Sequence, residues 1–245
     1  MTYHALRQQL ERSFLDSAHV VFSTLSSAAR LVPQDGGVRV KAFGAVIIDE
    51  AAQATEPATL VPLQLAHAKR CVLVGDDRQL PPTVFAPQAE VHLTARSLFE
   101  RLRIVGHRAE LLELQYRMSP HISAFPRAYF YGGVLRDAPG MEQRTVRRLH
   151  GICPPLLFVD LASSEAQRSE GASWRNWEEA RVCAKIVAHL CGEAVKLGEP
   201  DLANDVGVIT GYRAQQEVLK QALKRASAPV GPDVVRTVDG YQGRE

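Results

Sequence analysis

The feature that most constrains the fold is an uninterrupted apolar run, Val46-Ile47-Ile48, that ends in Asp49 and Glu50. Branched apolar residues without a polar interruption are typical of a strand that is buried on both faces of a parallel sheet. A second run, Cys71-Val72-Leu73-Val74, ends in the same way in Gly75-Asp76-Asp77. Ligands in open α/β sheets bind outside the carboxyl ends of the strands. The two acidic ends therefore predict one functional rim.

Strand and helix patterns alternate along the rest of the chain. Further strands are expected at 19–25, 109–114, 156–159, 206–210 and 234–238. Helices are expected at 3–17, 56–66, 97–102, 120–130 and 214–224, and from Asn176 onward, where Asn176 serves as the N-cap and Glu179 holds the capping-box position. The stretch 131–155 is interpreted as irregular. This alternation favours an α/β architecture with parallel strands in two lobes, 1–105 and 106–245.

Composition narrows the class of protein. The 245 residues carry a formal net charge of +2, so any basic surface must be local. The four cysteines form no Cys-x-x-Cys pair and are interpreted as reduced structural thiols, with Cys71 in a core strand. No stretch approaches the roughly 20 apolar residues of a membrane span, and the charged N-terminus does not resemble a signal peptide. An intracellular protein, cytoplasmic or nuclear, is expected.

Four motifs occur in a fixed order. They are Asp49–Pro57, Gly75–Pro82, Gln115–Pro120 and Val238–Glu245. In this order they resemble motifs II, III, IV and V of superfamily 1B helicases of the Upf/senataxin type. The resemblance implies the P-loop NTPase fold, in two RecA-like parallel-sheet lobes that are both incomplete at the chain ends. It also implies that ATP and Mg²⁺ bind between the lobes and that single-stranded RNA or DNA lies across them.

The resemblance also implies roles for single residues at the phosphates. Asp49 would hold Mg²⁺, and Glu50 would orient or deprotonate the attacking water. Gln79 would sense the γ-phosphate, and Arg117 would reach that phosphate from the second lobe. Phosphoryl transfer depends mainly on positioning and charge compensation, which these residue types supply.

The remaining nucleotide contacts are implied by motifs IV and V. Tyr116 would stack on the adenine, although a buried core position is its alternative. Glu245 would meet the nucleotide, with Gly243 allowing close backbone approach.

Hydroxyl-bearing residues are implied to contact the nucleic-acid strand. Ser23 and Thr24 would bind backbone phosphates in the first lobe, and the run Thr210–Gln215, including Tyr212, would do so in the second with Thr237. Contacts of this kind hold a strand without reading its sequence.

The chain departs from the family pattern at both ends. No glycine is followed by lysine, so the P-loop of motif I is absent, and the motif VI arginine is absent as well. We therefore expect a fragment of an ATP-dependent 5′ to 3′ helicase or translocase that is inactive alone and open to protein regulators. Two alternatives stay open. One is a non-catalytic remnant that binds nucleic acid or protein, and the other is a metal nuclease built on Asp49, Asp76 and Asp77.

Overall fold

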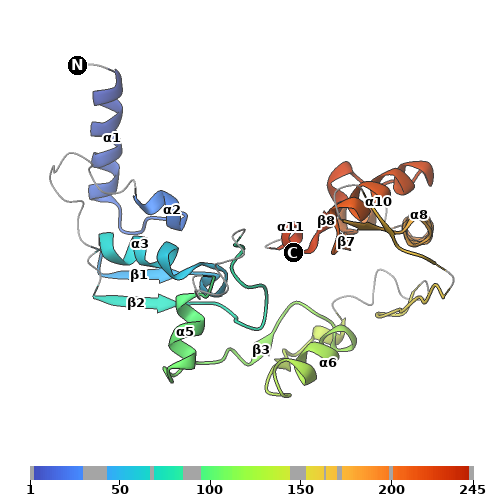
Figure 1. The fold of residues 1–245 in the computed structure, drawn as a ribbon, viewed down its shortest axis with the longest axis horizontal. Coiled ribbons are helices and arrows are strands. Elements are labelled where there is room, and N and C mark those ends of the chain that lie inside the picture. The colour runs from blue at the N-terminus through green and yellow to red at the C-terminus, as the bar shows by residue number, and fades with distance from the viewer. Residues whose placement is uncertain are drawn as a thin grey trace. The chain divides into compact units, whose positions relative to one another are not determined.

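The computed structural model describes residues 3–29, 43–66, 69–84, 95–143, 153–162, 164–169, 173–198 and 201–242 (Figure 1). The chain divides into two compact units, Met1–Glu110 and Leu111–Glu245.

The first unit is built around one parallel strand pair. Ala45 pairs with Arg70 and Ile48 with Leu73, which places both acidic turns at the same end of the pair. The helix between the two strands makes this a strand–helix–strand unit, as parallel pairing requires. The elements of the unit are α1 (Tyr3–Ser17), α2 (Leu25–Ala28), β1 (Ala45–Ile48), the 3₁₀ turn η2 (Ala51–Gln53), α3 (Glu56–Ala66), β2 (Arg70–Leu73) and α5 (Leu98–Ile104).

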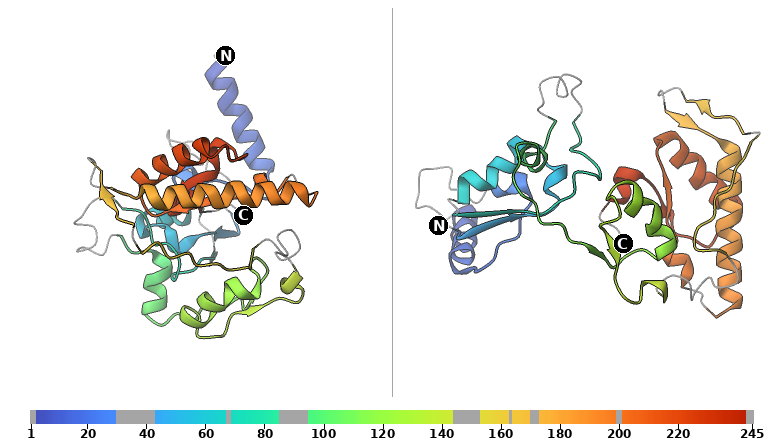
Figure 2. Two further views of the ribbon diagram at one scale, coloured as in Figure 1. Left: turned by 90° about the vertical axis from the view of Figure 1, so that its right-hand side faces the viewer. Right: turned by 90° about the horizontal axis from the view of Figure 1, so that it is seen from below.

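The prediction that this sheet is buried on both faces was wrong. Ile48 is 3% exposed, but Ile47 is 70% and Val72 48% exposed, and Cys71 is exposed rather than part of a core. The physical reason is the size of the sheet. Among the described residues β1 and β2 pair only with each other, and α3 packs against β1 (Figures 1 and 2).

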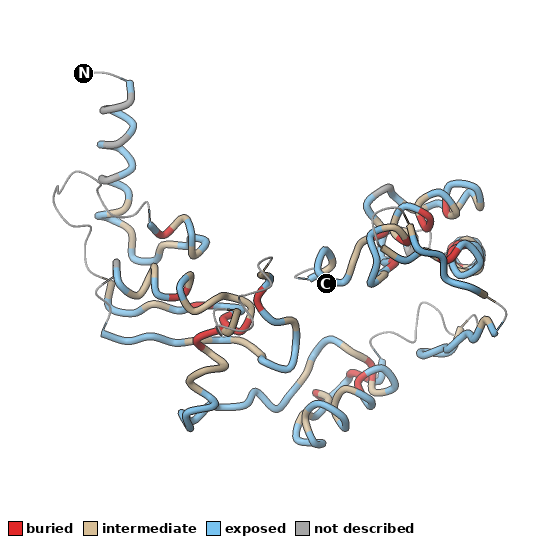
Figure 3. Tube along the Cα trace, in the orientation of Figure 1, coloured by how far each residue is buried: buried red, intermediate tan, exposed pale blue. Residues whose placement is uncertain are grey.

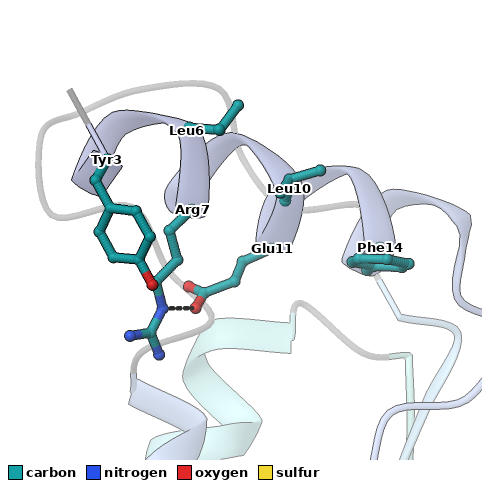
Figure 4. A pocket seen from close by; sticks show the side chains of 6 residues that line it. All are labelled: Tyr3, Leu6, Arg7, Leu10, Glu11 and Phe14. Atoms are coloured by element: carbon teal, nitrogen blue, oxygen red, sulfur yellow. Dashed lines mark hydrogen bonds and ion pairs between the residues drawn. The ribbon is translucent and has the colours of Figure 1, made fainter. Parts of the chain in front are cut away.

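The segment 19–25 does not form the predicted strand. It is irregular and leads into α2, where the Thr24 hydroxyl accepts a hydrogen bond from the Ser27 N–H. Serine and threonine side chains compete in this way with the ladder hydrogen bonds of a sheet. The helix predicted at 3–17 is confirmed, and Figure 4 shows its side chains. A shallow hollow along α1 is lined mainly by apolar residues, namely Tyr3, Leu6, Leu10 and Phe14, beside the Arg7–Glu11 ion pair.

The second unit contains two parallel strand pairs and one antiparallel pair. β3 pairs with β4 and β7 with β8 in parallel, each pair enclosing a helix, while β5 and β6 are antiparallel. Its elements are β3 (Leu114–Gln115), α6 (Pro120–Tyr129), β4 (Arg136–Asp137), the 3₁₀ turn η3 (Met141–Gln143), β5 (Gln167–Arg168), β6 (Trp174–Arg175), α8 (Trp177–Lys196), α9 (Leu202–Asp205), β7 (Val208–Thr210), α10 (Arg213–Arg225), the 3₁₀ turn η4 (Pro232–Val234), β8 (Val235–Thr237) and α11 (Val238–Tyr241).

Two strand predictions and one prediction of an irregular stretch need correction in this unit. The segment 156–159 forms no strand, and Phe158 in it is 88% exposed. The strand expected at 109–114 is limited to the two residues of β3, while β4 lies inside a stretch interpreted as irregular. Two-residue strands are too short to show the alternation by which strands are recognised.

The core of the second unit lies between α8, α10 and the β7–β8 pair (Figure 3). From the helical spacing, Ala180, Cys183, Val187 and Leu190 are expected on the buried face of α8; Ala180 and Val187 are buried, but Cys183 and Leu190 are only half-buried. The buried stripe is rich in alanine, which lets α10 approach closely. It consists of Ala180, Ala184, Val187, Cys191 and Ala194.

The predicted cap of α8 is confirmed, but the capping box is replaced by a longer-range contact. The Asn176 side chain accepts hydrogen bonds from the N–H groups of Glu178 and Glu179. The N–H of Asn176 itself donates to Gln215 Oε1 at 2.6 Å, and Gln215 Nε2 donates back to the Asn176 carbonyl at 3.0 Å. The Asn176 N–H is thereby bound to α10 rather than to a side chain of its own first turn.

No helix in the described ranges combines the length and the apolar character needed to cross a membrane.

Candidate functional site

The ends of β1 and β2 are joined by direct backbone contact. The Val74 N–H donates to the Ile48 carbonyl and the Ala51 N–H to the Val74 carbonyl, both at 2.8 Å. A Cβ on Gly75 would lie 2.8 Å from the backbone nitrogen of Ala52, so only glycine fits without a shift. The turn after β1 and the turn after β2 therefore lie side by side, as the shared rim predicted.

The two acids after β1 are held by a sharp backbone turn. Glu50 has φ of +51°, in the left-handed region that side chains rarely adopt. Its N–H donates to Asp49 Oδ1 at 3.0 Å, and its Oε2 accepts from Gln53 Nε2 at 2.7 Å. Backbone strain of this kind clusters at functional sites.

The turn after β2 is organised by Asp76. One carboxylate oxygen accepts the Arg78 N–H at 3.0 Å, and the other accepts Gln79 Nε2 at 2.9 Å. The neighbouring Asp77 forms an ion pair with Arg103 of α5, which ties this helix to the turn. Gln79 is exposed on the rim and oriented by Asp76.

The carboxylates of the rim suit a magnesium ion that is shared with phosphates. Among the described residues no group of three or more His, Cys, Asp or Glu could hold a metal ion. Mg²⁺ usually takes one or two carboxylates and completes its shell with phosphate oxygens and water, which fits Asp49. The nuclease alternative is not supported, because Asp76 and Asp77 are engaged by Gln79 and Arg103.

The turn after β3 carries Tyr116 and Arg117. Tyr116 is 61% exposed, so its ring is open to stacking, and the alternative of a buried core tyrosine is wrong. The Gln115 side chain closes the turn, because its Oε1 accepts hydrogen bonds from the N–H groups of Arg117 and Met118. Gln115 also donates to Asp137 of β4 at 2.7 Å.

Asp137 is a charged group enclosed by hydrogen-bond donors. Burial raises the pKa of this carboxyl, but hydrogen bonds from Ser123 and Gln115 and the charge of Arg127 outweigh burial and hold its pKa below the ordinary value. The sequence reasoning missed this residue. Its link to the Tyr116–Arg117 turn arises only from β3–β4 pairing, across 22 positions of the chain.

The residues of the second unit that are predicted to contact the nucleic-acid strand lie at the ends of β7 and β8. Thr210 and Thr237 are register partners on adjacent parallel strands, which lie about 4.8 Å apart. Thr210 Oγ1 accepts the Tyr212 N–H, and Thr237 Oγ1 accepts the Gly240 N–H. Each hydroxyl thus uses an acceptor site locally and keeps its O–H to donate. Gln215, at the end of the same predicted run, is instead buried against Asn176.

Ser23 and Thr24 are the residues of the first unit that were predicted to contact the nucleic-acid strand. In the first unit Ser23 Oγ donates to the Thr24 carbonyl, and Thr24 caps α2. Gly243 and Glu245 fall outside the described residues. The part of motif V that is described is held by Tyr241, whose ring lies over Gly207, where a side chain would overlap it.

Comparison with known families defines the class of protein. Residues 2–87 and residues 94–245 each match a family model described as an AAA domain. These matches imply the P-loop NTPase fold, which agrees with the small parallel α/β units. The arrangement in two RecA-like lobes, both incomplete at the chain ends, stays a prediction.

Individual relatives define the family. The chain is 36% identical over 244 residues to "Helicase SEN1" of Saccharomyces cerevisiae, covering 98% of this chain and 11% of that protein. It is 35% identical to "ATP-dependent helicase NAM7" of the same yeast, covering 98% of this chain and 24% of that protein. It is also 35% identical to "ATP-dependent helicase upf1" of Schizosaccharomyces pombe, covering 96% of this chain and 25% of that protein.

The chain belongs to the superfamily 1B helicases of the Upf/senataxin type. It spans between a tenth and a quarter of the length of these three relatives.

Proposed function

We propose that the chain forms part of an ATP-dependent helicase or translocase that moves 5′ to 3′ along single-stranded RNA or DNA. ATP and Mg²⁺ would bind between two RecA-like lobes, 1–105 and 106–245. Relatives whose names include "ATP-dependent helicase", similar over nearly the whole chain, support this assignment.

The contact between Gly75 and the Ala51–Ala52 backbone is the observation that carries the proposal. It joins the turn that holds Asp49 and Glu50 to the turn that holds Gln79. When bound, Mg²⁺ would compensate the phosphate charge. Asp49 would hold the ion, and Glu50, fixed by Gln53, would orient the attacking water. Gln79 would sense the γ-phosphate from the adjoining turn.

The second unit would complete the nucleotide site. Arg117 would offer its planar set of donors to the γ-phosphate, and Tyr116 would stack on the adenine. Gly243 and Glu245 would meet the rest of the nucleotide. The exposure of Tyr116 supports the stacking role.

Hydroxyl groups would hold the nucleic-acid strand by its phosphates. Thr210 and Thr237 are adjacent on β7 and β8 and can act together, with Tyr212 beside them. Ser23 and Thr24 would serve the first unit. A cytoplasmic or nuclear location and control by protein regulators belong to the same proposal, and the free thiols of the four cysteines support the location.

The test is nucleic-acid-stimulated phosphate release by the protein made from its complete reading frame. Glu50→Gln should lower kcat about 10²- to 10⁴-fold, the usual contribution of a positioned base, and leave strand binding unchanged. Glu142→Gln, at an exposed position of the second unit, is the matched control. Unwinding of duplexes with a 5′ or a 3′ tail tests direction. Strand binding without ATP hydrolysis by the wild type would favour the non-catalytic remnant instead.

A further inference from the structure

The turn that carries Tyr116 and Arg117 is closed by a fully occupied side-chain amide. Gln115 Oε1 accepts the Arg117 N–H at 2.8 Å and the Met118 N–H at 2.7 Å. Gln115 Nε2 donates to the Met118 carbonyl and to Asp137 Oδ1, both at 2.7 Å. An amide has two donor and two acceptor positions, and all four are used. Because each partner can only donate or only accept, the amide has a single orientation.

Asp137 anchors this amide to two further elements. Its Oδ1 also accepts a hydrogen bond from the Ser123 hydroxyl at 2.7 Å, and its Oδ2 accepts one from Arg127 Nη1 at 2.6 Å. The Asp137 side chain is 12% exposed, and Gln115 and Asp137 are register partners on β3 and β4. One carboxylate therefore connects both strands of the pair to α6.

The position of the Tyr116–Arg117 turn depends on this network. Its two strands are only two residues long, so few ladder hydrogen bonds fix the turn. The turn instead rests on the Gln115 amide, while Tyr116 projects outward with 61% of its surface exposed. A catalytic group displaced by about 1 Å can lose 10²-fold in rate.

We propose that Asp137 and Gln115 are positioning residues that hold Arg117 in place for ATP hydrolysis. The proposal rests on the proposed role of Arg117 at the γ-phosphate. Neither residue touches the nucleotide in this scheme, and both act through the backbone of the turn.

The first test measures the turn directly, by hydrogen exchange of single amides in the complete protein. Gln115→Glu has nearly the same shape, but it places a carboxylate oxygen against the Asp137 carboxylate and the Met118 carbonyl. Protection of the Arg117 and Met118 amides should fall about 10-fold or more, as expected when a hydrogen bond worth about 1.4 kcal/mol is lost. Glu113→Gln removes only the exposed ion pair with Arg136 and serves as the control.

The second test asks whether the network acts through Arg117. Gln115→Glu should lower kcat about 10- to 100-fold, and in an Arg117→Ala background it should lower kcat no further. A residue that only supports folding would lower kcat by the same factor in both backgrounds. Asp137→Asn keeps an acceptor for Gln115 but loses the charge that pairs with Arg127, so an intermediate loss is expected. If Gln115→Glu fails to fold, the milder variant Asp137→Asn takes its place in both tests.

The outcomes separate this proposal from the proposed function. Unchanged amide protection in both variants overturns the network as a support of the turn. Lost protection with wild-type kcat, while Arg117→Ala is inactive, overturns its positioning role. If Arg117→Ala keeps wild-type kcat, the function assigned to Arg117 has failed, and the positioning proposal fails with it even though the exchange data show the network intact.

Discussion

An added Cβ on Gly75 would lie 2.8 Å from the backbone nitrogen of Ala52 and 3.0 Å from that of Ala51. Carbon atoms of real side chains essentially never approach a backbone nitrogen so closely. The two acidic turns of the first unit can therefore adjoin only because position 75 has no side chain. This contact also gives the glycine of motif III a physical role, because it lets the turn that holds Gln79 lie against the turn that holds Glu50.

Gly75→Ala is expected to destabilise the first unit. The added methyl group meets backbone atoms that cannot rotate away, and overpacking of this kind costs about 1–3 kcal/mol. Urea unfolding should show a lower midpoint with an unchanged slope. Gly44→Ala is the control, because nothing lies within 4 Å of a Cβ at that position. Equal midpoints for the two variants would mean that the contact is not needed.

Two substitutions of Glu50 are expected to have the same activity but different stability. Its φ of +51° suits glycine, and a side chain there costs about 1 kcal/mol. Glu50→Gly and Glu50→Ala both remove the carboxylate and should be equally inactive. The free energy of unfolding of Glu50→Gly should nevertheless be about 1 kcal/mol higher than that of Glu50→Ala, so Glu50→Gly should unfold at a higher urea concentration. The inverse order of stability would show that the left-handed turn is not strained.

Long periodic segments of this chain could be predicted from the sequence, and short ones could not. The helices α3, α8 and α10 follow from their periodicity, because each covers enough positions to show it, and the strands β1 and β2 follow from apolar runs that end in acidic turns. Parallel pairing followed from the alternation of strands with helices. The β3–β4 pair was missed because two residues show no period.

Side-chain contacts between residues far apart in the sequence could not be predicted, for a different reason. Asp76 lies in the same turn as Gln79, so their contact is local. Asp137 reaches Gln115 across 22 positions, and Gln215 reaches Asn176 across 39. Such contacts depend on register and helix packing, which only the folded chain defines. The burial of Gln215 is the clearest case, since its motif indicated an exposed phosphate contact.

The pairing of Gln215 with Asn176 is expected to be a main support of the second unit. Gln215→Ala leaves the buried N–H of Asn176 without its acceptor, while the Asn176 carbonyl keeps only the Ala180 N–H, and the expected cost is about 1–3 kcal/mol. Gln221→Ala, at an exposed position of the same helix, should be neutral or slightly stabilising. Thermal unfolding of the two variants gives the comparison. A similar melting temperature in both would mean that water replaces the Gln215 amide.

Acid should weaken the second unit through Asp137. Its pKa in the folded chain lies below the ordinary value of 3.8. A group with a depressed pKa contributes stability that is fully present above its unfolded pKa and is lost as the pH falls toward the folded pKa. Wild-type unfolding free energy should therefore drop between about pH 5 and about pH 3 more steeply than that of Asp137→Asn, which has no proton to gain. Urea unfolding at several pH values, with Asp160→Asn at an exposed position as the control, measures the difference. If Asp137→Asn keeps the wild-type pH dependence, the Asp137 carboxylate does not carry the acid sensitivity of this unit.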